Sequence, residues 1–342
     1  TVREGRHYEV SVSSRGTKTV LLFEDISERI VNEERISYMA RYDVLTGLPN
    51  RGYFVEQVEA LLRLRREAGE PVHVALWIVD IDDFKHINDT MGHVAGDKVL
   101  AALGPRLCTA FGPGTICARL GGDEFIAFHA EGAPPEVLAQ IGNRVLAGMG
   151  EEVQTPGRRL KVDVSIGVVV SDDLSDTLEG LMVKADLATY AAKSGGKNKL
   201  VHFHERMDTE YHMRQQLKAD LKQAIAEGGL SVAYQTIVDP RSKKITGCEA
   251  LARWTHPVYG AISPVTFIPI AEETGLITDL TRAVLGMATR DCLSWPDGIT
   301  VAVNFSARDF WAADVGTMVL ETLAASGLPL LSASSARLPI HS

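Results

Sequence analysis

Residues 121–125 read Gly-Gly-Asp-Glu-Phe, and the rest of the chain can be organised around this stretch. The two glycines separate two short apolar runs, residues 115–120 and 125–129. Glycine adopts the positive φ that tight turns require, so the pattern predicts a β-hairpin whose turn holds both glycines. The acidic pair Asp123 and Glu124 follows at once on the rim of this turn. Such a pair is either a set of solvated turn residues or part of a cation site.

The composition is that of an ordinary globular protein, with 342 residues, 45% of them hydrophobic and 23% charged. This length allows two domains and partial ones beside them. The net charge of −9 argues against nucleic acid or an anionic membrane as a partner. The longest apolar run, residues 72–81, is too short to span a bilayer. The four cysteines show no C-x-x-C spacing, which indicates a reducing compartment. We therefore expect a cytoplasmic location for this part of the protein.

The start of the chain predicts a small sheet and a helix. The chain does not begin with Met, so we expect it to belong to a longer protein, with room upstream for a sensor or a membrane anchor. Residues 8–13 and 18–23 form two strand-like runs, which we assign to a first segment, 1–24. Residues 25–42 form a helical linker with a thin apolar stripe. Two alternatives stay open for it: a solvated connector, or a short coiled coil between two protomers.

The next segment, residues 43–204, predicts a mixed α+β domain. Its apolar patterns give helices over 51–67, 95–111, 135–149 and 176–193 and strands over 72–81, 115–120, 125–129 and 160–170. From residue 72 the order is βαββαβ, a ferredoxin-like arrangement. In that topology the first and third strands are antiparallel neighbours. The end of the first strand, at Asp80, therefore lies beside the start of the third, at Asp123 and Glu124. This convergence favours a cation site over solvated turns.

The chemistry of these side chains suits a metal-bound polyphosphate. Carboxylates without His or Cys match Mg²⁺, with Mn²⁺ able to replace it, and Mg²⁺ commonly shares its coordination with substrate phosphates. Lys85 follows the acidic cluster of residues 80–83 (DIDD), and Lys193 and Lys197 lie at the end of the last helix and just after it. Lysines of this kind can neutralise phosphate as point charges, although for Lys193 taken alone a partner of the helix C-terminal dipole is the better interpretation.

The same segment resembles the GGDEF family, the diguanylate cyclases. The matching stretches keep the family's order and spacing: residues 43–51 (DVLTGLPNR), 80–89 (DIDDFKHIND), 92–97 (GHVAGD), 119–125 (RLGGDEF), 165–167 (SIG) and 185–198. The family fold is nucleotidyl-cyclase-like. Its members condense two GTP molecules into cyclic di-GMP, with one GTP bound by each protomer of a homodimer.

The resemblance also implies roles for individual residues. Metal binding falls to Asp80, the carbonyl of Ile81, and Asp123; Asp123 is in addition the candidate proton acceptor, assisted by Glu124. The residues that the resemblance implies for nucleotide binding fall into three groups. Gly121 and Gly122 give the nucleotide access to the backbone; Lys85, Lys193, Lys197 and the amides of Asp83 and Phe84 hold phosphates; Asn88 and Asp97 read guanine, with His93 nearby. The family more often has Arg at the position of Lys197, so a bidentate phosphate contact is lost there.

The remaining residues, 205–342, resemble the first half of an EAL phosphodiesterase domain, a TIM-like barrel. By that resemblance Glu249 and Asn304 are two of several metal ligands, and Gln235 and Arg253 contact cyclic di-GMP. The other ligands of the family are missing, and from about residue 329 the tail no longer resembles it. Half a barrel cannot close its sheet, so we expect an incomplete domain without phosphodiesterase activity. The N-terminal strands similarly resemble the end of a PAS sensor domain.

The sequence therefore favours a Mg²⁺-dependent diguanylate cyclase with GTP as substrate. Two other functions stay open. One is a cyclic di-GMP phosphodiesterase, which the missing metal ligands disfavour. The other is a non-catalytic GTP-binding regulatory module, which the intact acidic residues disfavour.

Overall fold

The computed structural model describes residues 2–3, 6–15, 18–69, 73–130, 134–155, 158–172, 176–312 and 315–328. The chain divides into two compact units, residues 1–209 and 210–342. The tail predicted to be aberrant from about residue 329 lies outside the described residues, as do parts of the predicted PAS-like segment. Within the described part of the chain, no helix is long and apolar enough to cross a bilayer.

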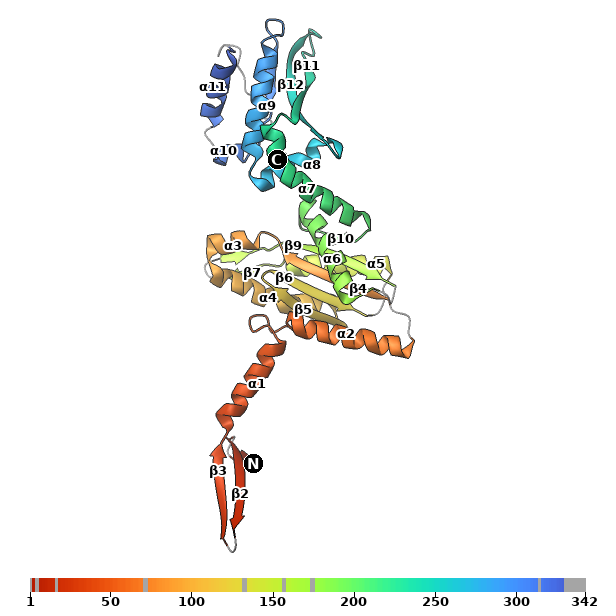
Figure 1. Cartoon of the computed structure of the whole chain (residues 1–342), viewed down its shortest axis with the longest axis vertical. Helices are drawn as coiled ribbons and strands as arrows, with labels where there is room; N and C mark the ends of the chain where they lie inside the picture. Colours follow the sequence, from red (N-terminus) through yellow and green to blue (C-terminus); the bar gives the residue numbers. More distant parts are fainter. Residues whose placement is uncertain are drawn as a thin grey trace. The chain divides into compact units, whose positions relative to one another are not determined.

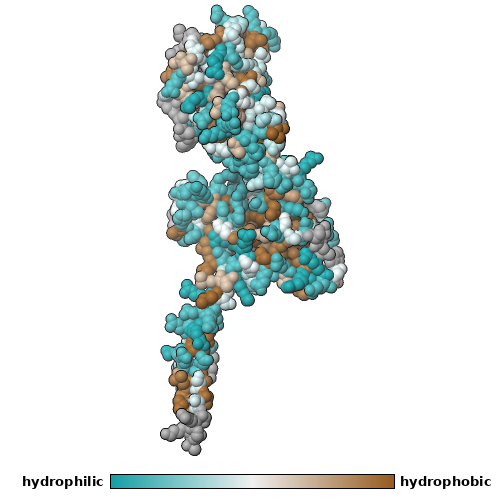
Figure 2. Space-filling view, viewed as in Figure 1, coloured by the Kyte–Doolittle hydropathy of each residue, from teal (hydrophilic) through white to brown (hydrophobic). Residues whose placement is uncertain are grey.

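The N-terminal strands form a small antiparallel sheet, β1 (Val2–Arg3), β2 (Arg6–Arg15) and β3 (Lys18–Asp25). Several of its large apolar side chains are 54–64% exposed, and the hairpin carries brown, hydrophobic patches in Figure 2. The exposed set is Val12, Val20, Leu21, Leu22 and Phe23. Helix α1 (Ser27–Arg41) follows and has no buried residue. A connector and a coiled coil both remain predictions for it.

The first unit is built on a five-stranded sheet with the order β10-β9-β4-β6-β5 (Figure 1). The strands are β4 (Val74–Ile81), β5 (Thr115–Gly121), β6 (Glu124–His129), β9 (Val164–Ser171) and β10 (Leu200–His202). Strand β4 pairs antiparallel with β6 on one side and with β9 on the other, and all its residues are buried. The predicted order of strands and the central position of β4 are thus confirmed.

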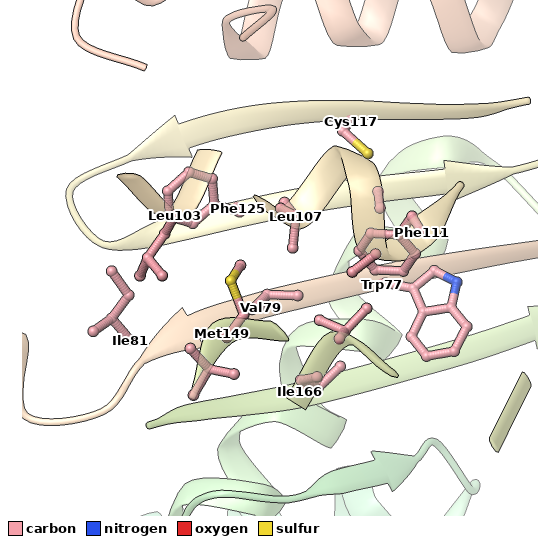
Figure 3. Close-up of a cluster of buried hydrophobic side chains, with 14 of the residues drawn as sticks. Trp77, Val79, Ile81, Leu103, Leu107, Phe111, Cys117, Phe125, Met149 and Ile166 are labelled. Atoms are coloured by element: carbon pink, nitrogen blue, oxygen red, sulfur yellow. The ribbon is translucent and has the colours of Figure 1, made fainter. Parts of the chain in front are cut away.

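Helices cover both faces of this sheet. They are α2 (Arg51–Ala68), α3 (Phe84–Met91), α4 (His93–Phe111), α5 (Pro135–Met149) and α6 (Leu178–Ser194). Alternate residues of β4 enter two hydrophobic clusters: Trp77 and Val79 pack with residues of α4 and α5, whereas Leu76 and Ile78 pack with residues of α2 and α6. Figure 3 shows the first cluster, with Phe111 of α4 against Trp77. A strand buried on both faces explains the unbroken apolar run in the sequence.

Some predicted boundaries were wrong. The strand predicted over 160–170 begins too early, because β9 starts only at Val164 and residue 160 ends a separate short pair, β7 (Val153–Thr155) and β8 (Arg158–Leu160). The residues before α4 form the additional helix α3, and Gly92 separates the two helices at φ 81°. Pro105 lies inside α4 without splitting it. Leu103 and Leu107 are fully buried on either side of Pro105, and their packing holds the helix together there.

The second unit has an open mixed sheet and its own hydrophobic core. Its strands are β11 (Leu230–Val238), β12 (Ile245–His256), β13 (Gly260–Ile262) and β14 (Thr300–Val303). Its helices are α8 (Pro264–Thr274), α9 (Ile277–Cys292), α10 (Asp309–Ala312) and α11 (Val315–Ser326), and α7 (Arg206–Ala226) begins in the first unit. Strand β14 pairs with β12 in parallel, and no further strand among the described residues pairs with β14.

Candidate active site

The turn of the β5–β6 hairpin is shifted by one residue from the predicted one. Gly121 is the last residue of β5 and pairs with Glu124, the first of β6, so the turn consists of Gly122 and Asp123. The backbone φ angles of Gly121 and Gly122 are 146° and 53°. Both values favour glycine, and the turn therefore places Asp123 at its own tip.

The two acidic clusters meet at one edge of the sheet. In the β4–β6 register Asp80 lies opposite Glu124, and the Ile81 amide donates to the Asp123 carbonyl at 3.3 Å. The side chain of Lys193, from the end of α6, reaches the same edge. The fold thus brings together the residues that the sequence proposed for the metal.

Asp80 has the most unusual environment at this edge. It is only 3% exposed; its Oδ2 lies 2.6 Å from Lys193 Nζ, and its buried Oδ1 has no hydrogen-bond partner among the described residues. Burial raises the pKa of Asp80 to about 6; the ion pair with Lys193 opposes this rise, and the charges of Asp123 and Glu124 add to it. A buried carboxylate oxygen without a donor fits a cation ligand, because such an atom is costly to leave unpaired.

Glu124 shares its electrostatic environment with a residue that the sequence did not single out. Burial raises the pKa of Glu124, and the charges of Asp186 on α6 and of Asp123 raise it further, against Lys193 and Arg51. No cluster of three or more His, Cys, Asp or Glu side chains positioned to hold a metal occurs in the described part of the chain. A cation at this edge would therefore also need oxygens from the backbone or the substrate. The Ile81 carbonyl was proposed for that role.

The residues proposed for the phosphates flank the N-terminus of α3. Asp83 is its N-cap with φ 55°, and Phe84 and Lys85 are in its first turn, where backbone amides lack helical acceptors. Lys197, in the loop after α6, places its Nζ 2.6 Å from Asp83 Oδ1. The Lys85 side chain is exposed and has no described contact with the acidic edge.

The residues proposed to read guanine lie at the junction of α3 and α4. The Asn88 side chain rests against Gly96, since a Cβ there would lie 2.1 Å from Asn88 Oδ1. Asp97 is the next residue and is exposed, as is His93 at the start of α4. Neither Asp97 nor His93 has a described contact with the acidic edge.

Arg119 fastens the β5–β6 turn to the segment that precedes α2. Its Nη2 donates to the Gly122 carbonyl at 2.6 Å, and its Nη1 lies 3.1 and 3.0 Å from the two carboxylate oxygens of Asp43. The pKa of Asp43 lies below its usual value, because hydrogen bonds from Thr46 and Arg119 outweigh the effect of burial. Arg119 and Asp43 stand in two of the matching motifs, and the sequence indicated no role for either.

The candidate residues of the second unit are only partly assembled. Gln235 and Glu249 are cross-strand partners on β11 and β12, and Asn304 Nδ2 donates to Glu249 Oε1 at 2.7 Å. Arg253 Nη1 instead donates to the backbone carbonyl of Ala252 at 2.9 Å. The structure thus joins the two proposed metal ligands and places Gln235 beside them.

Two family models match the chain. "Diguanylate cyclase, GGDEF domain" matches residues 40–199, and "EAL domain" matches residues 218–330. The chain belongs to the GGDEF–EAL family of signalling proteins. The GGDEF residues form the α+β domain described above, and the EAL residues lie in a portion of mixed strands and helices.

Relatives of this GGDEF–EAL chain are known from several bacteria. An uncharacterised signalling protein of Caulobacter vibrioides is 39% identical over 91% of this chain and 38% of its own length. The bifunctional diguanylate cyclase/cyclic di-GMP phosphodiesterase MucR of Pseudomonas aeruginosa is 34% identical over 82% of this chain and 41% of its own. The solved S helix–GGDEF–EAL structure of Vibrio cholerae LapD, bound to c-di-GMP, shares the fold at TM-score 0.50 and 17% identity, over 82% of this chain and 64% of that one. The chain spans 36–49% of the length of the first curated relatives.

Proposed function

We propose that residues 43–204 form a diguanylate cyclase domain that condenses two GTP molecules into cyclic di-GMP. The observation that carries this proposal is the buried Asp80 oxygen without a donor, beside Lys193 and opposite the turn that holds Asp123 and Glu124. It is the arrangement that a divalent cation and a polyphosphate would complete. Mg²⁺ is the expected ion, since the side chains that surround the position offer only carboxylate oxygens.

Asp80, Asp123 and the Ile81 carbonyl would hold the metal ion. A divalent cation bound there supplies charge neutralisation for the triphosphate and favours ionisation of the attacking 3′-hydroxyl. Asp123, at the tip of the turn, accepts the proton of that hydroxyl. Glu124, whose pKa is raised, lies next to Asp123 and supports it.

The other residues bind and orient the nucleotide. The amides at the start of α3, with Lys85 and Lys197, hold the terminal phosphates, and Lys193 can turn from Asp80 toward them. In each step the 3′-oxygen of one GTP forms a bond to the α-phosphorus of the other, and diphosphate leaves. Asn88 and Asp97 select guanine, because a carboxylate accepts from both N1–H and N2–H, whereas adenine offers no such pair of donors.

The reaction needs two sites that face each other, so we propose that the active species is a homodimer. Each protomer would present one GTP, and two condensations would release two molecules of diphosphate.

Phosphodiesterase activity is the second candidate function, and one observation favours it. Asn304 and Glu249 are in contact at 2.7 Å, with Gln235 opposite Glu249, so three residues proposed for a cyclic di-GMP site lie together in the second unit. We propose that this portion is inactive, because the described residues bring together only two of the proposed metal ligands, Glu249 and Asn304. A non-catalytic GTP-binding module is the third candidate.

Two incubations and a binding measurement separate these functions. The whole chain is mixed with GTP or with cyclic di-GMP in the presence of Mg²⁺, the products are resolved by liquid chromatography with mass detection, and GTP binding is measured by calorimetry. Cyclic di-GMP supports the cyclase, and its conversion to the linear dinucleotide supports the phosphodiesterase. GTP binding without product supports the regulatory module.

Asp123→Asn tests the site itself. Because the variant loses the proton acceptor and a proposed metal ligand, its rate should fall by about a hundredfold or more. The matched control is Asp172→Asn, whose side chain is 69% exposed and pairs with His73 just beyond β9. A fully active Asp123→Asn would refute the assignment, whereas the control should keep its activity.

A further inference from the structure

We propose that Asp82 is a positioning residue that holds the loop of residues 195–198 in the shape that phosphate binding requires. The inference rests on the proposed function for the nature of the ligand, a nucleoside triphosphate. Asp82 has no assigned role in that function, although its neighbours on both sides do.

The carboxylate of Asp82 is buried and fully engaged. The residue is 8% exposed; its Oδ1 accepts from the Ser165 hydroxyl of β9 at 2.7 Å, and its Oδ2 accepts from the Asn198 amide at 3.0 Å. The Asp82 amide also donates to the Asp163 carbonyl at 2.9 Å. Asp82 is thereby fixed to the end of the sheet through Ser165 and Asp163. Its second oxygen, Oδ2, binds the Asn198 amide in the loop after α6.

That loop has a backbone conformation that needs support. Lys197 and Asn198 are consecutive non-glycine residues with φ 61° and 45°. Side chains other than glycine disfavour this region, so such residues persist only where surrounding contacts determine them. The Lys197 amide donates to the Ala192 carbonyl at 3.0 Å, which continues the end of α6. The Asn198 amide donates to Asp82, so Asp82 anchors the far side of the strained pair.

The anchored loop carries a phosphate ligand of the proposed site. Lys197 Nζ lies 2.6 Å from Asp83 Oδ1, and Asp83 is itself held at φ 55° as the N-cap of α3. The two strained segments are thus joined by this ion pair at the start of α3, where the amides proposed for the phosphates lie. Asp82 precedes one of them directly and bonds to the other, so it sets their spacing without touching the ligand.

The hydrogen-bond pattern predicts which substitutions are tolerated. In Asp82→Asn, the amide oxygen can accept from the Asn198 amide while Nδ2 donates to Ser165, whose hydroxyl can reverse. In Asp82→Ala both bonds are lost. Ser165→Ala removes only the bond to the sheet and leaves the loop anchored, so it is the matched control.

The test measures binding by calorimetry with two probes that cannot react to product: 3′-deoxy-GTP with Mg²⁺, and inorganic tripolyphosphate. Asp82→Ala should weaken both by about tenfold or more, since a charged hydrogen bond is lost. Asp82→Asn and Ser165→Ala should stay within about threefold of the unmodified chain. Hydrogen–deuterium exchange of residues 195–199 should accelerate in Asp82→Ala alone.

A rescue variant separates positioning from general stability. Asn198→Gly in the Asp82→Ala background should recover part of the lost affinity, because glycine adopts a positive φ without penalty. If Asp82→Ala does not fold, Asp82→Ser takes its place with the same expected outcomes.

The inference is overturned if Asp82→Ala binds both probes as the unmodified chain does, or if Ser165→Ala loses as much affinity. Its failure can be told apart from that of the proposed function. A chain that makes no cyclic di-GMP but loses probe binding in Asp82→Ala supports the inference and refutes the cyclase. If the unmodified chain binds neither probe, hydrogen–deuterium exchange of residues 195–199 becomes the test. Faster exchange in Asp82→Ala supports the positioning role, and unchanged exchange refutes it.

Discussion

The buried carboxylate of Asp80 should contribute more stability to the first unit at acidic pH than at neutral pH. The pKa of Asp80 rises from 3.8 to about 6 on folding, mainly through burial. Between these values the folded chain keeps a proton that the unfolded chain releases. The stabilisation is therefore complete below pH 3.8 and is lost as the pH rises through about 6.

The magnitude follows from the two pKa values. A rise from 3.8 to about 6 corresponds to about 3 kcal/mol, at about 1.4 kcal/mol per tenfold change in proton affinity. Asp80→Asn removes the titration while keeping the shape of the side chain. The difference in unfolding free energy between Asp80→Asn and the unmodified chain should therefore shift by about 3 kcal/mol in favour of the variant from pH 3.5 to pH 7.

The assay is urea unfolding with EDTA present, followed by fluorescence in a background where Trp77 is the sole tryptophan. Trp77 is fully buried on β4, so its signal reports the unfolding of the same strand that carries Asp80. Asp83→Asn is the control, because the Asp83 side chain is 64% exposed and its replacement should cost less than about 0.5 kcal/mol. A difference between Asp80→Asn and the unmodified chain that does not change with pH would refute the reasoning.

Two further predictions concern the cations at the site. Lys193→Met should raise the affinity for Mn²⁺ without nucleotide about tenfold, about 1.4 kcal/mol, because the ammonium 2.6 Å from Asp80 no longer competes with the ion. Electron paramagnetic resonance of free Mn²⁺ measures this; Lys197→Met is the control, and unchanged affinity in Lys193→Met would contradict the competition. Arg119→Ala should destabilise the first unit by about 2 kcal/mol, because Asp43 and the turn lose a donor that is only 13% exposed. Thermal unfolding checks this, and Arg119→Lys should lose less; equal stability of all three chains would show that the clamp contributes nothing.

The sheet was predictable because its signals are strong and local. The unbroken apolar run before Asp80 predicts a strand buried on both faces. The order βαββαβ then requires that strand to neighbour the one that begins at Glu124. The register that pairs Asp80 with Glu124 follows from these two facts and the position of the turn.

The supporting contacts were not predictable, because they join residues that are far apart in sequence. Asp82 stands among other acids in the chain, and only the fold shows that it meets Ser165 and Asn198, 83 and 116 positions away. The influence of Asp186 on Glu124 likewise depends on where α6 crosses the sheet. One indication about Asp82 was present in the sequence: it directly follows a buried strand, a position that favours a buried side chain.

The pairing of β6 has a consequence for where this chain tolerates changes in length. Strand β6 is in register with β4 on one side and β5 on the other, and only Gly122 and Asp123 connect it to β5. An inserted residue in that turn would have to be taken up by a longer loop or would displace one register by a single step. Because side chains alternate along a strand, the step would drive Glu124 into the place of the fully buried Phe125. A label or a grafted peptide therefore belongs in the short β7–β8 pair, which is separate from the main sheet, and not at the β5–β6 hairpin.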